Sequence, residues 1–156
     1  GKSRQAEIDF AKATPTSEPT LLPTIEPISE HMGLDTYRHA DAAYSLYEDG
    51  RYSEAILEFN KALKLYPFFA SKHAGSHGLS TSSIQLADWY FYRALSYHHT
   101  KQHWGSIADY AKAYQYNPNL VQAYYNRGIS FRMVGVLSHA KADLDKACEL
   151  DSRFCQ

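Results

Sequence analysis

The histidines are the residues of this sequence whose side chains most readily suggest a chemical site, because neighbouring imidazoles can bind a transition metal. His73 and His77 lie in the Gly/Ser/His-rich stretch SKHAGSHGLSTSS, which is expected to form a loop and supplies no third ligand. His98 and His99 are separated from His103 by a predicted turn. We therefore expect exposed or half-buried histidines and no metal site.

The two cysteines are the next candidates for chemistry. Cys148 and Cys155 are seven residues apart, which on a continuous helix is about 10 Å of rise and beyond the reach of a disulfide. They can pair only if the helix unwinds before Cys155. We therefore expect two free thiols, with Cys148 on a packed face and Cys155 on a frayed end.

The sequence contains no nucleophile elbow, phosphate-binding loop or pair of catalytic carboxylates, so we predict that the chain is not an enzyme and needs no cofactor. Its 16 basic residues are scattered and balanced by 17 acidic residues, which disfavours nucleic-acid binding. The 13 tyrosines could stack on RNA bases, but without a basic stripe packing is their favoured role. No window approaches the roughly 20 apolar residues of a membrane span.

A repeat of about 34 residues organises the elements that would position any site. The stretch 87–120 has two apolar-periodic segments, a short polar break and a closing Asn-Pro. The stretches 36–69 and 121–154 show the same order of small, aromatic and charged residues at the same offsets. Each repeat is predicted to form two helices, so the domain at 35–156 is expected to be an all-α solenoid.

The first repeat has clear helix boundaries in the sequence. Asp35 is a plausible N-cap, Gly50 breaks the first helix, and Pro67 is expected to end the second. Residues 68–86 then form an insertion of roughly half a repeat, whose Gly/Ser/His-rich centre is predicted to be a loop. Thr81 or Ser82 is a candidate cap for a forward extension of the next helix through Ile84 and Leu86.

Residues 1–34 differ in composition from the repeats. A short helix is predicted over 1–13, and the Pro/Thr-rich stretch 14–29 favours extended polyproline II structure. One interpretation is a linker that tethers the repeats to an upstream segment. The alternative is an arm whose apolar residues dock into a groove of this or a neighbouring molecule, the candidates being Leu21, Leu22 and Ile25.

Small residues recur at three offsets of each repeat, where they would let paired helices approach closely while aromatic residues fill the space between them. These positions are Ala43, Ala55 and Ala62, then Ala94, Ser106 and Ala113, then Gly128, Ala140 and Ala147. Each second helix also has an acid followed three residues later by a lysine, which predicts solvated ion pairs. The pairs are Glu58–Lys61, Asp109–Lys112 and Asp143–Lys146.

The repeat length, the turn glycines Gly50 and Gly135 and the closing prolines Pro67 and Pro118 resemble the tetratricopeptide repeat (TPR) family over about 120 residues. The resemblance implies a right-handed superhelix of three helix-turn-helix repeats, preceded here by the extended Pro-rich arm. Three residues depart from the family pattern: His39 at an apolar position, Lys101 at the middle turn and Ser152 at the last proline position.

The resemblance also implies that the first helix of each repeat lines a concave face that binds an extended or helical peptide. Helical periodicity places one stripe of each first helix on this face, separate from the stripe that packs. The predicted ligand-binding residues are Tyr37, Tyr44, Tyr47, Asp88, Phe91, Tyr92, Leu95, His98, Gln122, Tyr125, Asn126, Ile129 and Arg132.

One TPR subclass holds the C-terminal carboxylate of a chaperone with Lys, Arg and Asn side chains of this face. The corresponding positions here are Ala40, Tyr44, Tyr92, Gln122 and Asn126, so no charged member of that clamp is present. We expect this protein not to bind such acidic tails, because their carboxylates would be desolvated without a cationic partner.

The leading functional hypothesis is therefore a protein-interaction scaffold whose protein or peptide partner the sequence does not identify. The alternative is a self-assembly module, a homo-oligomer held by the N-terminal arm or by the apolar edge of the last helix, which no following helix would cover. That edge includes Leu144, Cys148 and Leu150. RNA binding by the aromatic face is a third hypothesis.

The compartment stays open at this stage. A Thr/Pro-rich segment before a repeat domain resembles the stalks of membrane-tethered bacterial proteins outside the cytoplasm, but cytoplasmic repeat proteins also carry such linkers. The first residue is Gly1 and not methionine, which points to a processed protein or to part of a longer one.

Overall fold

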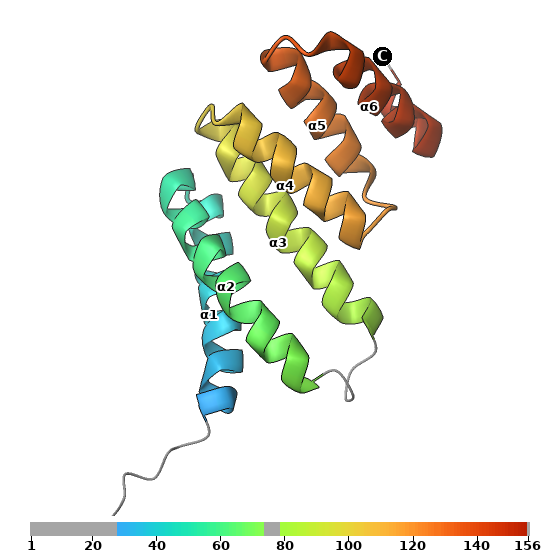
Figure 1. Ribbon diagram of the computed structural model, residues 1–156. Coiled ribbons are helices and arrows are strands. Elements are labelled where there is room, and N and C mark those ends of the chain that lie inside the picture. Colours follow the sequence, from blue (N-terminus) through green and yellow to red (C-terminus); the bar gives the residue numbers. More distant parts are fainter. Residues whose placement is uncertain (1–27, 74–78, 156) are drawn as a thin grey trace, which may run out of the picture.

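Helices make up the part of the chain that the computed structural model describes, residues 28–73 and 79–155 (Figure 1). The elements are α1 (Ile28–Glu48), α2 (Tyr52–His73), α3 (Leu79–His99), α4 (His103–Tyr116), α5 (Val121–Met133), α6 (Leu137–Leu150) and the short 3-10 helix η1 (Ser152–Phe154). Consecutive helices pair into three hairpins, and the hairpins pack in chain order through α2 against α3 and α4 against α5. The predicted all-α fold of three helical hairpins is confirmed.

The three hairpin turns share one hydrogen-bonding geometry. The Gly50 N–H donates to the Tyr47 carbonyl at 3.0 Å, and Lys101 and Gly135 make the same bond to the residue three positions earlier, at 3.0 and 3.1 Å. All three adopt positive φ, +74° and +79° for the glycines and 61° for Lys101. The middle turn therefore keeps the shape of the others, although its lysine tolerates this left-handed backbone less well than glycine does.

Two predicted boundaries in the first half of the chain are wrong. Pro67 does not end the second helix, since α2 continues to His73, and α3 already begins at Leu79, so most of the predicted loop at 68–86 is helical. The first helix begins at Ile28, seven residues before the expected cap at Asp35. The predicted helix at 1–13, the Pro-rich arm up to residue 27, and residues 74–78 lie outside the described residues.

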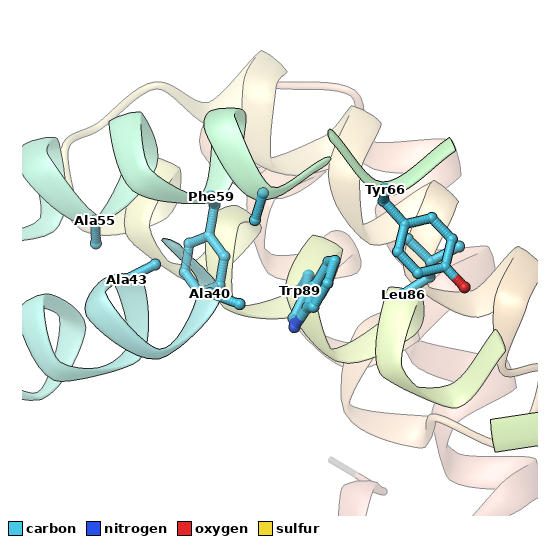
Figure 2. Packing of buried hydrophobic residues seen from close by; sticks show 8 residues of the cluster. Ala40, Ala43, Ala55, Phe59, Tyr66, Leu86 and Trp89 are labelled. Carbon is cyan, nitrogen blue, oxygen red and sulfur yellow. The ribbon is translucent and has the colours of Figure 1, made fainter. Parts of the chain in front are cut away.

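Buried side chains stand on α2 and α3 on either side of the segment 74–78. Tyr66, near the end of α2, and Leu86, in the first half of α3, are both buried. The Tyr66 ring lies edge-on to Trp89, with ring centroids 5.5 Å apart, and all three belong to one apolar cluster (Figure 2). Pro67 lies inside α2 at an exposed position, where its ring does not disturb this packing.

The small residues predicted at the helix contacts are buried at every one of the nine positions. Gly128 shows how closely α5 and α6 approach. A Cβ atom at this position would lie 2.9 Å from Leu144 Cγ and 3.1 Å from the Ala140 carbonyl oxygen. The hairpin therefore needs the absence of a side chain there.

The cysteines form a disulfide, so the prediction of two free thiols is wrong. That prediction assumed a helix that continues to a frayed end, but α6 ends at Leu150 and the chain turns back through η1. The turn brings the Cα atoms of Cys148 and Cys155 to 4.5 Å. It also places the Phe154 ring 5.1 Å from that of Tyr125, between centroids.

Gly128→Leu is expected to lower the free energy of unfolding by about 2 kcal/mol, because the new side chain overlaps Leu144 and the Ala140 carbonyl. Urea denaturation followed by circular dichroism measures the change. Gln122→Leu places the same side chain at an exposed position of the same helix and should change the free energy by less than about 0.5 kcal/mol. Equal effects of the two substitutions would refute the close approach of α5 and α6.

Reduction by a dithiol should destabilise the domain by about 2 kcal/mol, because it frees the short loop that the disulfide closes in the unfolded chain. The measurement is the urea midpoint with and without the reductant. The double variant Cys148→Ser, Cys155→Ser should already be destabilised and should not respond to the reductant. A reductant effect of the same size in this variant would show that the disulfide is not its cause.

Candidate peptide-binding groove

Four predicted site residues from α1 and α3 lie together as one group of rings, Tyr44, Tyr47, Phe91 and Tyr92, here called the ring cluster. The centroid of Tyr92 lies 4.9 Å from that of Tyr44, 5.3 Å from Tyr47 and 5.7 Å from Phe91, each in an edge-to-face arrangement. All four rings are half-buried. Such pairs contribute about 1 kcal/mol each beyond area burial, so the cluster joins the first two hairpins and also forms part of the predicted binding face.

The other predicted residues of these helices are divided between packing and the face. Tyr37 meets the buried Trp89 edge-on at 6.0 Å, which places it against the core. Leu95 packs on the second apolar cluster, around Tyr110. His98 is partly buried between α3 and α5, where its Nδ1 atom lies 3.2 Å from Ser130 Oγ.

Burial, together with the neighbouring His103 and His99, lowers the pKa of His98, so the ring is neutral at pH 7. Ser130 Oγ also donates to a backbone carbonyl of its own helix, and Ser106 Oγ lies 3.0 Å away. This hydrogen-bonded junction gives His98 a structural role in addition to its predicted place on the face.

Two carboxylates lie near the ring cluster and give this part of the face a negative character. Asp88, on α3, is half-buried, and desolvation raises the pKa of its carboxyl. Burial raises the pKa of Tyr44, and the charges of Asp88 and Asp41 raise it further, which places both acids close to that phenol. A ligand at this point therefore meets two acids beside aromatic rings.

The predicted residues of α5 occupy the third hairpin. Tyr125, Asn126 and Ile129 are half-buried, while Gln122 and Arg132 are exposed. The ring of Phe154 packs against Tyr125, so η1 contributes to this end of the face. No sequence pattern predicts this place for Phe154, because its position depends on the turn that the disulfide closes.

Each of the last two hairpins also contains a partly buried arginine that the sequence interpretation did not identify as a structural residue. Arg93 Nε and Nη2 donate to the two carboxylate oxygens of Asp109 at 2.6 and 2.7 Å, and Nη1 donates to Asn60 of the preceding hairpin at 2.6 Å. The side chains of Arg93 and Asp109 are 16% and 8% exposed. The arginine thus binds the acid of its own hairpin in bidentate geometry, and one further hydrogen bond to Asn60 links it to the previous hairpin.

Arg127 repeats this arrangement one repeat later. It donates to both oxygens of Asp143 at 2.7 and 2.6 Å and to the Tyr114 hydroxyl of the preceding hairpin at 3.0 Å. Its guanidinium carbon also lies 4.6 Å from the centre of the Tyr114 ring. Both Arg–Asp pairs are separated by 16 residues in sequence, and this recurrence is the signal that could have revealed them.

These networks correct two of the three predicted ion pairs. Asp109 and Asp143 bind arginines and not the lysines three residues later, because their side chains point into the hairpin, where burial excludes water. Lys61 does pair with Glu58, at 2.5 Å. Glu58 also lies 2.6 Å from Nδ1 of His39, which accounts for the unusual histidine of the first repeat.

Within the described residues no group of three or more His, Cys, Asp or Glu side chains could hold a metal ion. The same residues include no helix that is both long and apolar enough to span a bilayer.

Asp109→Asn is expected to destabilise the domain by about 3 kcal/mol, because it leaves the buried Arg93 charge without its carboxylate. The matched control is Asp145→Asn, which breaks an exposed pair with Lys141 at 2.6 Å and should change stability by less than about 1 kcal/mol. Urea denaturation of both variants at pH 7 measures the difference. Similar losses would show that burial of the Arg93–Asp109 pair has no special weight.

Comparison with known proteins supports the fold. No family model matches the sequence. A TPR repeat-containing thioredoxin of Arabidopsis thaliana is 31% identical over 129 residues, which are 83% of this chain and 29% of that protein. The chain thus spans less than a third of the length of this relative.

Solved structures that resemble this chain in fold include two TPR domains. The first TPR domain of Spaghetti (RPAP3), solved with the HSP90 peptide SRMEEVD bound, is 20% identical with a TM-score of 0.60, covering 76% of this chain and 81% of that one. The TPR domain of Arabidopsis OM64 is 19% identical with a TM-score of 0.61, covering 78% and 86%. The repeated sequence pattern, the three stacked hairpins and these similarities agree, and the chain belongs to the tetratricopeptide repeat family as a right-handed superhelix of three repeats.

Proposed function

We propose that the chain is a non-enzymatic protein-interaction scaffold that binds a peptide segment of a partner along the face formed by α1, α3 and α5. The support comes from the rings and polar tips that this face presents, since tyrosine offers a flat apolar surface with a hydrogen-bonding end. The Spaghetti domain, which has the same fold, binds a peptide.

The chemistry of the expected peptide is inferred from the two carboxylates beside Tyr44. Asp41 and Asp88 lie where an acidic ligand would meet like charge, and the neighbouring position Ala40 is 1% exposed and offers no side-chain donor. An acidic C-terminal tail is therefore disfavoured. A peptide with leucine, proline or aromatic residues and a basic residue near Asp88 matches this chemistry.

The first test uses the peptide SRMEEVD, which binds the Spaghetti domain. Fluorescence anisotropy with the full chain should show no saturable binding below about 100 µM, because the face supplies acids where this tail needs cations. The variant Asp41→Lys, Asp88→Lys should bind the peptide more tightly, and more so at low salt. Micromolar binding by the unmodified chain would contradict the proposal.

The second test identifies what the face does bind. Selection of random displayed peptides on the full chain should enrich leucine, proline and basic residues, and the variant Asp88→Asn, Phe91→Ala should weaken the selected peptides at least tenfold, about 1.4 kcal/mol. Lys64→Ala, on the exposed side of α2, is the control and should leave binding unchanged. Peptides that bind the groove variant as tightly as the unmodified chain would remove this face from the proposed function.

A further inference from the structure

A pocket of about 340 Å³ lies at the far end of the array, on the last hairpin. Leu137, Ala140 and Leu144 of α6 and Phe154 of η1 form its apolar part, and Arg132 from the end of α5 stands at its edge. Leu137 is 65% exposed, so a large apolar side chain at this place is open to solvent in the described structure. The pocket can take apolar side chains of a peptide.

The equivalent surface of the preceding repeat indicates that this pocket lies where another helix could pack. At the preceding junction, Ser106 and Tyr114 of α4 contact α5: Ser106 Oγ lies 3.0 Å from Ser130 Oγ, and the Tyr114 ring stacks on Tyr124 at 4.8 Å. The residues 34 positions later are Ala140 and Cys148, and both line the pocket. The pocket therefore lies on the surface that, one repeat earlier, packs against the next helix.

The charged side chains that line the pocket indicate which kind of peptide it favours. Lys141 is paired with Asp145 at 2.6 Å, whereas Arg132 is exposed and has no ion pair within residues 28–73 and 79–155. An apolar segment followed directly by an acid would fill the pocket and place its carboxylate near this guanidinium.

We propose that the occupant is the segment Leu21–Glu26 of a second copy of this chain. Its sequence, LLPTIE, begins with two leucines and has the acid directly after Ile25. In a polyproline II segment Leu21 and Ile25 are about 12 Å apart, close to the rise of about 10 Å between Leu137 and Leu144 along α6. Prolines on either side reduce the conformational entropy lost on docking.

The position of α1 favours docking on a neighbouring molecule over docking on the same chain. The segment precedes α1, and α1 and α6 lie at opposite ends of the array (Figure 1). Docking on the next molecule joins the first end of one copy to the last end of another, a head-to-tail contact that repeats along a chain of molecules or closes into a ring. The pocket shares Arg132 and Phe154 with the third-hairpin end of the peptide face. Asp88 and Phe91 lie on α3, outside the pocket, so the variants that test the peptide face and the variants that test this pocket are different.

Sedimentation velocity of the full chain over a range of concentrations tests the proposal. The unmodified chain should associate as concentration rises, and Leu21→Ser with Ile25→Ser should reduce the association constant at least tenfold. Arg132→Glu and Glu26→Arg should each reduce it about fivefold, and the double variant should recover most of the loss because the charges are exchanged. Lys112→Glu, an exposed change on α4, should have no effect.

Three results of these experiments would contradict docking of Leu21–Glu26 on a second copy. A chain that stays monomeric at all concentrations refutes docking on a second copy, including the case in which the arm folds back on its own pocket. Association that ignores the arm and pocket variants refutes this interface. Failure of the charge exchange to restore association refutes the Arg132–Glu26 contact. Circular dichroism of every variant confirms that loss of association is not loss of folding.

Discussion

The close approach of paired helices at small residues is the constraint on which the rest of this structure depends. Ala43, Ala55 and Ala62 are fully buried in the first hairpin, and their counterparts are buried in the other two. At Gly128 even one additional carbon would meet Leu144 and a backbone carbonyl. Because the helices approach so closely, the aromatic residues on either side fill the space between hairpins, and this sets how the first helices lie side by side.

The Arg–Asp ion pairs restrict the geometry of this packing more than apolar contacts do. Arg93 and Arg127 each bind an acid of their own hairpin and a polar group of the preceding one, Asn60 and the Tyr114 hydroxyl. Apolar contacts tolerate small sliding movements, whereas a bidentate arginine and carboxylate fit in one geometry. Desolvation offsets much of the energy of such a pair, which joins the two helices of one hairpin. The third hydrogen bond of each arginine joins that hairpin to the preceding one.

The sequence predicts the features that repeat and misses those that depend on a particular neighbour. The period, the turn glycines and the small positions each appear in several copies, so a single sequence suffices to find them. The loop prediction at 68–86 used local composition, whereas α2 extends to His73 and α3 begins at Leu79, with Tyr66 and Trp89 packed against each other on either side of this stretch. The free-thiol prediction failed because the chain reverses after Leu150. The buried acids were assigned to the nearest lysines, although their partners lie 16 residues earlier.

In the candidate face, too, the repeat pattern predicts which side chains belong to it but not which neighbours they contact. Helical periodicity selects Tyr44, Tyr47 and Tyr92 for the face, but it does not reveal that these rings also hold α1 against α3. Their edge-to-face contacts keep the surface ordered before a ligand arrives, which lowers the entropy lost on binding. Loss of one of these rings therefore weakens both folding and recognition. The neighbouring carboxylate of Asp88 can be changed with less effect on packing. A charge substitution at Asp88 therefore tests the binding function of the face with less effect on folding than removal of one of its rings.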